Sequence, residues 1–205
     1  MQPSSRGEGG TTERTNMKLI FGGAYQGKLD YALQLITQTT TATTGTTTAT
    51  TGTTTGTHTA VNGTNHHTAT IGTEGTLVYT CPDIRSCDTP EDCLAALDLS
   101  GEIAKAEKAA GGTAPGAPLV IDHLERMVYA FIDAGRDPVA YIKEHPEIWE
   151  GRIVIIEDIS QGVVPIDTKE RAWREANGRV MAYLAGKAET VTRIFCGIPQ
   201  VLKQK

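Results

Sequence analysis

Residues 17–29 read Met17-Lys18-Leu19-Ile20-Phe21, then Gly22-Gly23-Ala24-Tyr25-Gln26-Gly27-Lys28, then Leu29. An apolar strand therefore runs directly into a glycine-lysine loop. In such an arrangement the turn between Gly22 and Gly27 can point successive backbone N–H groups at phosphate oxygens, and Lys28 can reach the outer phosphates from the start of the next helix. The sequence predicts that residues 22–29 bind the phosphates of a nucleotide.

The residues on either side of the loop fit this interpretation. Leu19 to Phe21 are apolar, and Leu29 to Ile36 have helical spacing without Gly or Pro. The residue after the lysine is usually Ser or Thr, whose hydroxyl ligates Mg²⁺, and Leu29 cannot do this. The alternative is a tight strand-to-helix turn with a solvated lysine, because short motifs of this kind also occur by chance.

Length, charge and cysteine content favour a domain that works in the cytoplasm. The chain has 205 residues and a formal net charge of -5, so a broad nucleic-acid surface is not expected. It contains no run of about 18 apolar residues and no apolar signal core at its N-terminus, so we expect neither a membrane span nor secretion. Because cytosolic thiols stay reduced, we interpret the cysteines as ordinary thiols rather than a metal cluster: Cys81, Cys87, Cys93 and Cys196.

Two segments are interpreted as additions to a nucleotide-binding domain that spans residues 17–205. Residues 1–16 are polar and lack periodicity, which predicts a disordered tail. Residues 37–75 are almost entirely Thr, Gly and Ala. Because this low-complexity insert has so little apolar surface to offset the entropy of ordering it, we expect it to be flexible. Three histidines in it are expected to be solvated: His58, His66 and His67.

The rest of the chain alternates between strand and helix patterns, which predicts an α/β fold with a mostly parallel sheet flanked by helices. Apolar runs predict strands at 76–81, 119–121, 152–156 and 191–196. Helical patterns cover 90–110, a segment that begins at His123, a segment from Pro138 to about Glu147, and 168–188.

Asp122 directly follows the strand at 119–121. An acidic residue at the carboxyl end of a buried strand, in a chain with a phosphate loop, is the expected group for holding or orienting Mg²⁺. Asp122 could instead cap the helix that begins at His123, and both roles are compatible. The strand at 152–156 ends in Glu157-Asp158. The loop beyond it lies at the sheet edge where open α/β sheets bind their ligands.

Residues 158–203 read DISQGVVPIDTKERAWREANGRVMAYLAGKAETVTRIFCGIPQVLK. This stretch resembles the C-terminal half of the adenosylcobinamide kinase / adenosylcobinamide-phosphate guanylyltransferase family, and the loop GGAYQGK is similar to that family's G-G-x-x-S-G-K. The features that carry the resemblance are, in order, Asp158, Gly162-Val163-Val164-Pro165, Arg171, Trp173-Arg174-Glu175, Gly178-Arg179, Leu184-Ala185, Gly197-Ile198-Pro199 and Leu202-Lys203.

The resemblance implies an enzyme of cobalamin biosynthesis on a RecA-like P-loop fold, commonly a homotrimer. Such an enzyme phosphorylates the aminopropanol hydroxyl of adenosylcobinamide with GTP or ATP, and then transfers GMP from GTP to that phosphate through a guanylylated histidine. Catalytic roles for Lys28, Asp122 and Asp158 are implied, with Mg²⁺ held near Asp122. Positioning and charge neutralisation would dominate the phosphoryl transfer.

Three positions depart from the family pattern. Leu29 replaces the usual Ser or Thr, and Met181 stands where Gly-Arg-x-Asn has its Asn. The family places its nucleophilic histidine after the second strand, whereas here no histidine follows the strand at 77–81 before His123. The sequence therefore favours the kinase reaction over GMP transfer. The alternatives are a catalytically reduced nucleotide-binding relative that acts as a sensor or partner subunit, and a P-loop enzyme for an unrelated small molecule.

Overall fold

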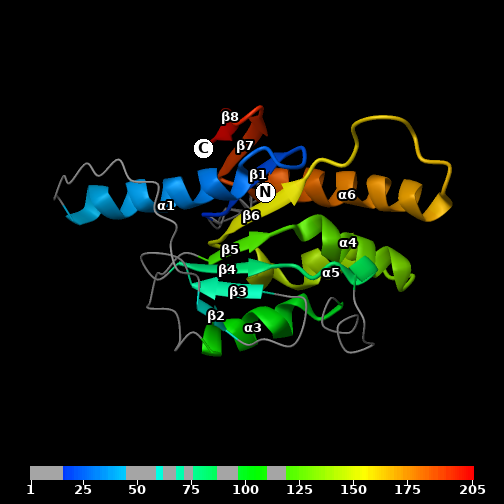
Figure 1. Cartoon of the computed structure of the whole chain (residues 1–205), viewed down its shortest axis with the longest axis horizontal. Coiled ribbons are helices and arrows are strands. Elements are labelled where there is room, and N and C mark those ends of the chain that lie inside the picture. The colour runs from blue at the N-terminus through cyan, green and yellow to red at the C-terminus, as the bar shows by residue number, and fades with distance from the viewer. Residues whose placement is uncertain (1–15, 45–58, 62–67, 72–75, 87–96, 110–118) are drawn as a thin grey trace, which may run out of the picture.

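The computed structural model describes residues 16–44, 59–61, 68–71, 76–86, 97–109 and 119–205. These residues form one sheet with helices against both faces (Figure 1). The strands are β1 (Lys18–Gly22), β2 (Thr59–Val61), β3 (Thr68–Ile71), β4 (Leu77–Thr80), β5 (Leu119–Asp122), β6 (Ile153–Glu157), β7 (Thr190–Phe195) and β8 (Ile198–Gln204). The helices are α1 (Lys28–Thr44), α3 (Leu99–Ala109), α4 (Leu124–Asp133), α5 (Pro138–Glu144) and α6 (Thr168–Lys187), with short 3₁₀ turns η2 (Ile84–Ser86) and η3 (Pro146–Ile148).

The sheet has eight strands in the order β2-β3-β4-β5-β6-β1-β7-β8. The central strands β4, β5, β6, β1 and β7 run parallel to one another. Antiparallel pairings attach β3 and then β2 at one edge and β8 at the other. The predicted mostly parallel sheet flanked by helices is therefore confirmed, and β1 with its glycine loop lies inside the parallel part.

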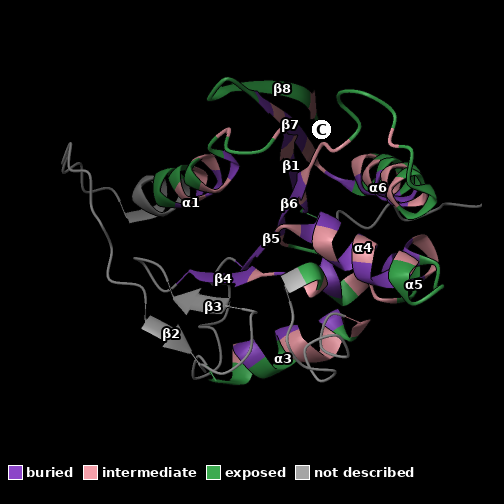
Figure 2. Cartoon of the chain, turned by 45° about the vertical axis from the view of Figure 1, so that its right-hand side comes forward, coloured by how far each residue is buried: buried purple, intermediate pink, exposed green. Residues whose placement is uncertain are grey.

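The two faces of the central strands pack against different helices, because successive side chains of a strand point to opposite faces of the sheet. Leu19 and Ile121 belong to a buried cluster that includes side chains of α3, α4, α5 and α6. Ile20 and Val120, their neighbours in sequence, belong to a second cluster with side chains of α1. Figure 2 shows α1 on the side of the sheet opposite α4 and α6. Burial on both faces explains why these strands read as continuous apolar runs.

The segment 37–75, expected to be a flexible insert, is partly ordered. α1 continues through Thr37 to Thr44, and β2 and β3 also lie in the segment. Extending a helix costs less than starting one, and the Thr37 hydroxyl donates to the Leu33 carbonyl oxygen at 3.1 Å. In the strands, β-branched threonine suits an extended backbone, and pairing of β3 with β4 satisfies main-chain groups.

Several predictions concern residues that the structure does not describe. They are the tail apart from Asn16, the remaining parts of the insert at 45–58, 62–67 and 72–75 with His58, His66 and His67, and the start of the helix expected at 90–110. Cys87 and Cys93 also lie outside the described residues, whereas Cys81 is a buried and Cys196 an exposed free thiol. None of the described helices has the length and apolar character needed to span a bilayer.

The last strand, β8, was not predicted from the sequence. It pairs antiparallel with β7, and its register shifts between Val191 and Thr192 on the β7 side. Three of its large apolar side chains are exposed: Ile198, Val201 and Leu202. A strand that buries neither face lacks the alternation of apolar and polar residues on which strand prediction depends.

Gly22, the last residue of β1, has no space for a side chain. A Cβ at this position would lie 2.4 Å from the main-chain oxygen of Ile194 in β7. We expect Gly22→Ala to lower the free energy of unfolding by about 1–3 kcal/mol, because either β7 or the loop after β1 must shift.

The matched control is Gly178→Ala in α6, where a Cβ would meet nothing within 4 Å. That substitution should raise the free energy of unfolding by about 0.5–1 kcal/mol, because alanine is the better helix former. Urea unfolding of both variants checks the pair. A Gly22→Ala protein as stable as the wild type would show that β1 and β7 are not in tight contact.

Candidate functional site

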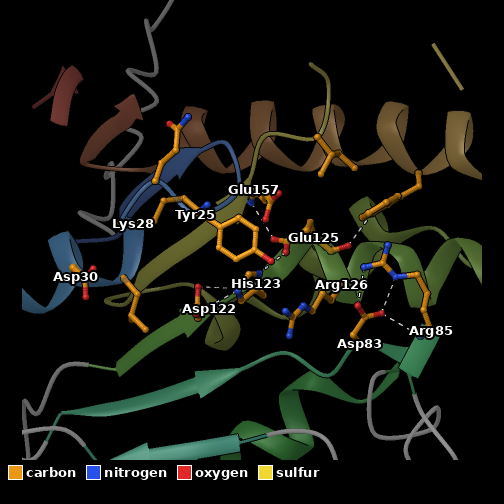
Figure 3. A pocket seen from close by; sticks show the side chains of 16 residues that line it. Tyr25, Lys28, Asp30, Asp83, Arg85, Asp122, His123, Glu125, Arg126 and Glu157 are labelled. Atoms are coloured by element: carbon orange, nitrogen blue, oxygen red, sulfur yellow. Dashed lines mark hydrogen bonds and ion pairs between the residues drawn. The ribbon is translucent and has the colours of Figure 1, made fainter. Parts of the chain in front are cut away.

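A cavity of about 530 Å³ lies at the carboxyl ends of β1, β5 and β6. This is the edge of an open α/β sheet where ligands are usually bound. Figure 3 shows charged side chains converging on it from the loop after β1, from the start of α4 and from the end of β6. The lining residues are Ala24, Tyr25, Gln26, Gly27, Lys28, Leu29, Asp30, Asp83, Arg85, Asp122, His123, Glu125, Arg126, Glu157, Ile159 and Trp173.

The glycine loop ends at Lys28, the first residue of α1. Gly27 has a φ of +77°, a left-handed conformation that glycine adopts without strain, and this lets the chain enter the helix directly. The Lys28 side chain is only 7% exposed, and its Nζ donates to the carbonyl oxygen of Gly23 at 2.6 Å. The loop therefore folds around its own lysine, while Tyr25 stands fully exposed at the rim of the cavity.

Asp122 and His123 form the turn between β5 and α4. His123 has a φ of +59°, which is unusual for a residue other than glycine, and it occupies the position before the first residue of α4. The main-chain N–H of His123 donates to Oδ1 of Asp122 at 3.0 Å. Asp122 therefore closes the turn before the helix rather than capping the first turn of α4.

The left-handed turn brings His123 against Glu125. Nδ1 of His123 lies 2.7 Å from Oε1 of Glu125, and the other carboxylate oxygen of Glu125 accepts the main-chain N–H of Glu157 at 2.9 Å. Glu125 is only 4% exposed. Its carboxylate thus joins the start of α4 to the end of β6. Asn177 of α6 adds a second contact there, because its Nδ2 donates to the Glu157 carbonyl oxygen at 2.9 Å.

Among the described residues, His123, Glu125 and Glu157 form a group of three side chains that could ligate a metal ion. One ligand atom from each lies within 4.8 Å of the others. Imidazole nitrogen and carboxylate oxygen are both common ligands of divalent cations in proteins. These three residues could therefore hold a cation, with Asp122 beside them.

The surroundings shift the pKa values of the four groups in different directions. Burial raises the pKa of Asp122, with a further contribution from the Glu125 charge. The pKa of Glu157 is raised for the same two reasons. Burial also opposes ionisation of Glu125, but the hydrogen bond with His123 and the Glu157 amide outweigh it and lower its pKa. The hydrogen bond to Glu125 raises the pKa of His123. The surroundings therefore disfavour ionisation of Asp122 and Glu157 and favour ionisation of Glu125.

Two arginines line the part of the cavity away from the glycine loop. The Arg85 guanidinium donates to both carboxylate oxygens of Asp83, at 2.8 and 2.7 Å, and lies 5.1 Å from the ring centroid of Trp173. Arg126 donates to the Cys81 carbonyl oxygen at 3.2 Å. This side of the cavity can attract an anionic or aromatic group of a ligand.

The structure brings together most of the residues predicted for the site. Residues 24–29 and Asp122 line the cavity, Gly22 ends β1 behind it, and Gly23 contributes the carbonyl oxygen bound by Lys28. Asp158 is not among the lining residues, because its carboxylate accepts hydrogen bonds from the main chain and hydroxyl of Ser160 and from Gln161. Glu157, one residue earlier, lines the cavity instead.

The sequence interpretation missed Glu125 and did not single out Glu157. The position of each residue next to a predicted strand could have identified it. Glu157 ends an apolar strand, as Asp122 does, and Glu125 follows Asp122 in the first turn of the next helix. Leu29 also lines the cavity, and its side chain packs against the cluster beneath α1. The position that usually supplies a hydroxyl is therefore apolar in this pocket.

No protein-family model matches the chain, and no curated protein sequence matches it. Function therefore has to be inferred from the residues of the pocket and from their geometry.

The buried charge of Asp122 should cost stability. Because its pKa is raised in the folded protein, the ionised carboxylate destabilises the fold at pH above that pKa, and this cost disappears as the pH falls below the ordinary value. Asp122→Asn removes the charge, while the amide oxygen can still accept the His123 N–H. We expect Tm at pH 7 to rise by roughly 2–4 °C, about 1 kcal/mol in a domain of this size.

Differential scanning calorimetry between pH 7 and pH 4 checks this expectation. The gain in Tm should shrink as the pH falls. Glu175→Gln serves as the control, since the Glu175 side chain is 72% exposed and the change should leave Tm almost unaltered. A lower Tm for Asp122→Asn at pH 7 would mean that the carboxylate stabilises the turn more than its burial costs.

Proposed function

We propose that this protein binds a nucleoside triphosphate with the phosphates on residues 22–28 and transfers the terminal phosphoryl group to a hydroxyl of adenosylcobinamide. The observation that carries the proposal is the position of Lys28. It is a buried cation at the start of α1, in a cavity at the carboxyl ends of β1, β5 and β6 that also contains Asp122.

Phosphate binding is supported by what surrounds Lys28. In the described part of the chain, Lys28 forms no ion pair with a carboxylate within 4.0 Å, and its hydrogen-bond partner is the neutral carbonyl of Gly23. A phosphate oxygen could replace that partner with a charged one, which makes a stronger hydrogen bond. The first turn of α1 also presents main-chain N–H groups without partners in the helix, and these favour an anion.

The residues of the cavity fit a Mg²⁺ ion that accompanies the nucleotide. Mg²⁺ prefers oxygen ligands and keeps several waters, and Asp122 and Glu157 supply carboxylate oxygens that face the cavity. Asp122 is the residue that we propose holds the ion, directly or through water. Bound there, Mg²⁺ would neutralise charge on the phosphates. Leu29 cannot contribute a hydroxyl ligand, so the carboxylates are the protein groups that we propose bind Mg²⁺.

The acceptor and the fold family rest on the resemblance of residues 158–203. We propose a RecA-like P-loop fold and a homotrimer on the same grounds. The loop that carries much of the resemblance is held by two arginines of α6: Arg171 donates to Pro165 and Ile166 carbonyl oxygens, and Arg174 to that of Val163 at 2.9 Å. Val163, Val164 and Ile166 are left exposed in the loop between β6 and α6, where they could contact an apolar ligand.

The proposal is limited to the kinase reaction. GMP transfer through a histidine requires an imidazole that is free to attack the α-phosphate from a rigid element. Among the described residues that line the cavity, His123 is the only histidine, and its Nδ1 is occupied by Glu125. The second candidate function is nucleotide binding without turnover, by a relative that acts as a sensor or partner subunit. Leu29 favours it, because the usual metal-binding hydroxyl is missing.

Lys28→Ala should weaken binding of GTP or ATP at least about tenfold, which corresponds to about 1.4 kcal/mol, because the phosphates lose their nearest cation. Isothermal titration calorimetry with either nucleotide and Mg²⁺ measures the effect. Lys105→Ala is the control, since Lys105 lies on the exposed side of α3. Equal affinities of the wild type and Lys28→Ala would exclude the loop as the phosphate site.

Turnover is tested with GTP that carries label on either the γ- or the α-phosphate, together with Mg²⁺ and adenosylcobinamide. The kinase proposal expects γ-label in the product and no α-label on the protein. If Leu29 limits metal binding, Leu29→Ser should increase Mg²⁺-dependent turnover. Nucleotide binding without any labelled product, in the wild type and in Leu29→Ser, would support the sensor function instead.

A further inference from the structure

We infer that His123, Glu125 and Glu157 form a binding site for a divalent transition-metal ion, such as Mn²⁺, that is filled without nucleotide. The site lies in the same cavity as the proposed phosphate site, but it does not depend on the proposed phosphoryl transfer, because all three ligands come from the protein.

The distances suit a metal ion after small side-chain adjustments. Two ligands at right angles, each about 2.1 Å from an ion, lie about 3 Å apart. Nδ1 of His123 and Oε1 of Glu125 are 2.7 Å apart, and the ligand atom of Glu157 is within 4.8 Å of both. The second oxygen of Glu125 is fixed by the Glu157 N–H. A metal would therefore replace the proton between His123 and Glu125, while the Glu125 side chain stays in place.

Asp122 provides an independent sign that the cavity accommodates a cation. Its side chain is only 6% exposed and lines the cavity, and Oδ1 accepts the His123 N–H. Within the described residues, Oδ2 has no hydrogen-bond donor, and the nearest ring nitrogen of His123 is 3.8 Å away. This oxygen of Asp122 is therefore available to a cation or to the water ligands of one.

The basic side chains of the cavity do not satisfy these carboxylates directly. Lys28 donates to the Gly23 carbonyl, Arg126 donates to the Cys81 carbonyl, and Arg85 is paired with Asp83. In the described part of the chain, neither lysine nor arginine forms an ion pair with Asp122, Glu125 or Glu157 within 4.0 Å. Three carboxylates are therefore balanced by one histidine at close range, and a divalent cation would remove the excess negative charge.

The nitrogen ligand determines which cations the site prefers. Carboxylate oxygens suit Mg²⁺, Ca²⁺ and Mn²⁺, whereas imidazole suits transition-metal ions such as Fe²⁺, Ni²⁺ and Zn²⁺, so a mixed set of ligands favours a transition metal over Mg²⁺. Mn²⁺ is the most suitable probe because it accepts both oxygen and imidazole ligands and has little preference for thiolates. Binding to the cysteines of the chain would therefore not be mistaken for this site.

The experiment titrates the full-length protein with Mn²⁺ in the absence of nucleotide and follows free Mn²⁺ by electron paramagnetic resonance. We expect one bound Mn²⁺ per chain that a roughly tenfold excess of Mg²⁺ does not displace. Pulsed measurements should show coupling to a ¹⁴N nucleus that disappears in His123→Gln. Glu125→Gln and Glu157→Gln should each lower Mn²⁺ affinity about tenfold or more.

His145→Gln is the matched control. His145 and Glu147 have the same spacing in the sequence and the same contact, with Nδ1 2.8 Å from Oε1, but they are more exposed and have no third ligand among the described residues. This variant should keep full Mn²⁺ affinity. Glu125 is buried, so substitution there could unfold the protein, and circular dichroism is recorded for all variants. If Glu125→Gln is not folded, the effect on Mn²⁺ affinity is judged from Glu157→Gln.

Three results would overturn the inference: no bound Mn²⁺ in the wild type, ¹⁴N coupling that persists in His123→Gln, or equal loss of affinity in His145→Gln. Lys28→Ala separates this inference from the proposed function. The Lys28→Ala protein should lose nucleotide binding and still bind Mn²⁺. The nucleotide site and the Mn²⁺ site can therefore be rejected independently of each other.

Discussion

The close packing of β1 against β7 and β6 positions the glycine loop and Glu157 at the cavity. This five-residue strand lies between β6 and β7, and Gly22 lets the main chain of β7 approach so closely that no side chain fits between them. The loop that follows is therefore anchored on both sides before it turns into α1. Because β6 also pairs with β1, Glu157 comes level with Gly22. The glycine loop and the acidic residues opposite it are therefore both positioned by the pairing of β1 with β6.

Within that frame, one buried carboxylate organises the opposite wall of the cavity. Glu125 contacts His123 through one oxygen and the Glu157 amide through the other. Folding must offset the desolvation of Glu125 and Asp122, and a protein selected only for stability would gain by replacing such groups with apolar ones. Ionisable groups held in unfavourable surroundings are typical of functional sites. The cost of this cluster is therefore itself an argument that the cavity has a function.

The sequence was sufficient to predict those parts of the fold in which an apolar run of residues is also a buried strand. β1, β5 and β6 are apolar runs, and the glycine loop has a distinctive spacing, so these elements and Asp122 could be identified. The interpretation of the Thr-rich segment as wholly flexible was incomplete, because β3 pairs with β4 and β2 pairs with β3, and composition alone does not predict such pairing. The resemblance pointed to Asp158, whereas the cavity is lined by the preceding residue, Glu157, because successive residues at the end of a strand point in opposite directions. A catalytic role for Asp158 stays a prediction.

The order of strands also has a consequence for how the protein is made. Lys18 pairs with Ile153 on one side and with Thr190 on the other, so β1 is made long before either of its neighbours in the sheet. Contacts so distant in sequence form slowly. During synthesis the glycine loop can be held in shape only after β6 and β7 have been made. A truncated or stalled product would carry the complete loop sequence and still be unable to hold a ligand.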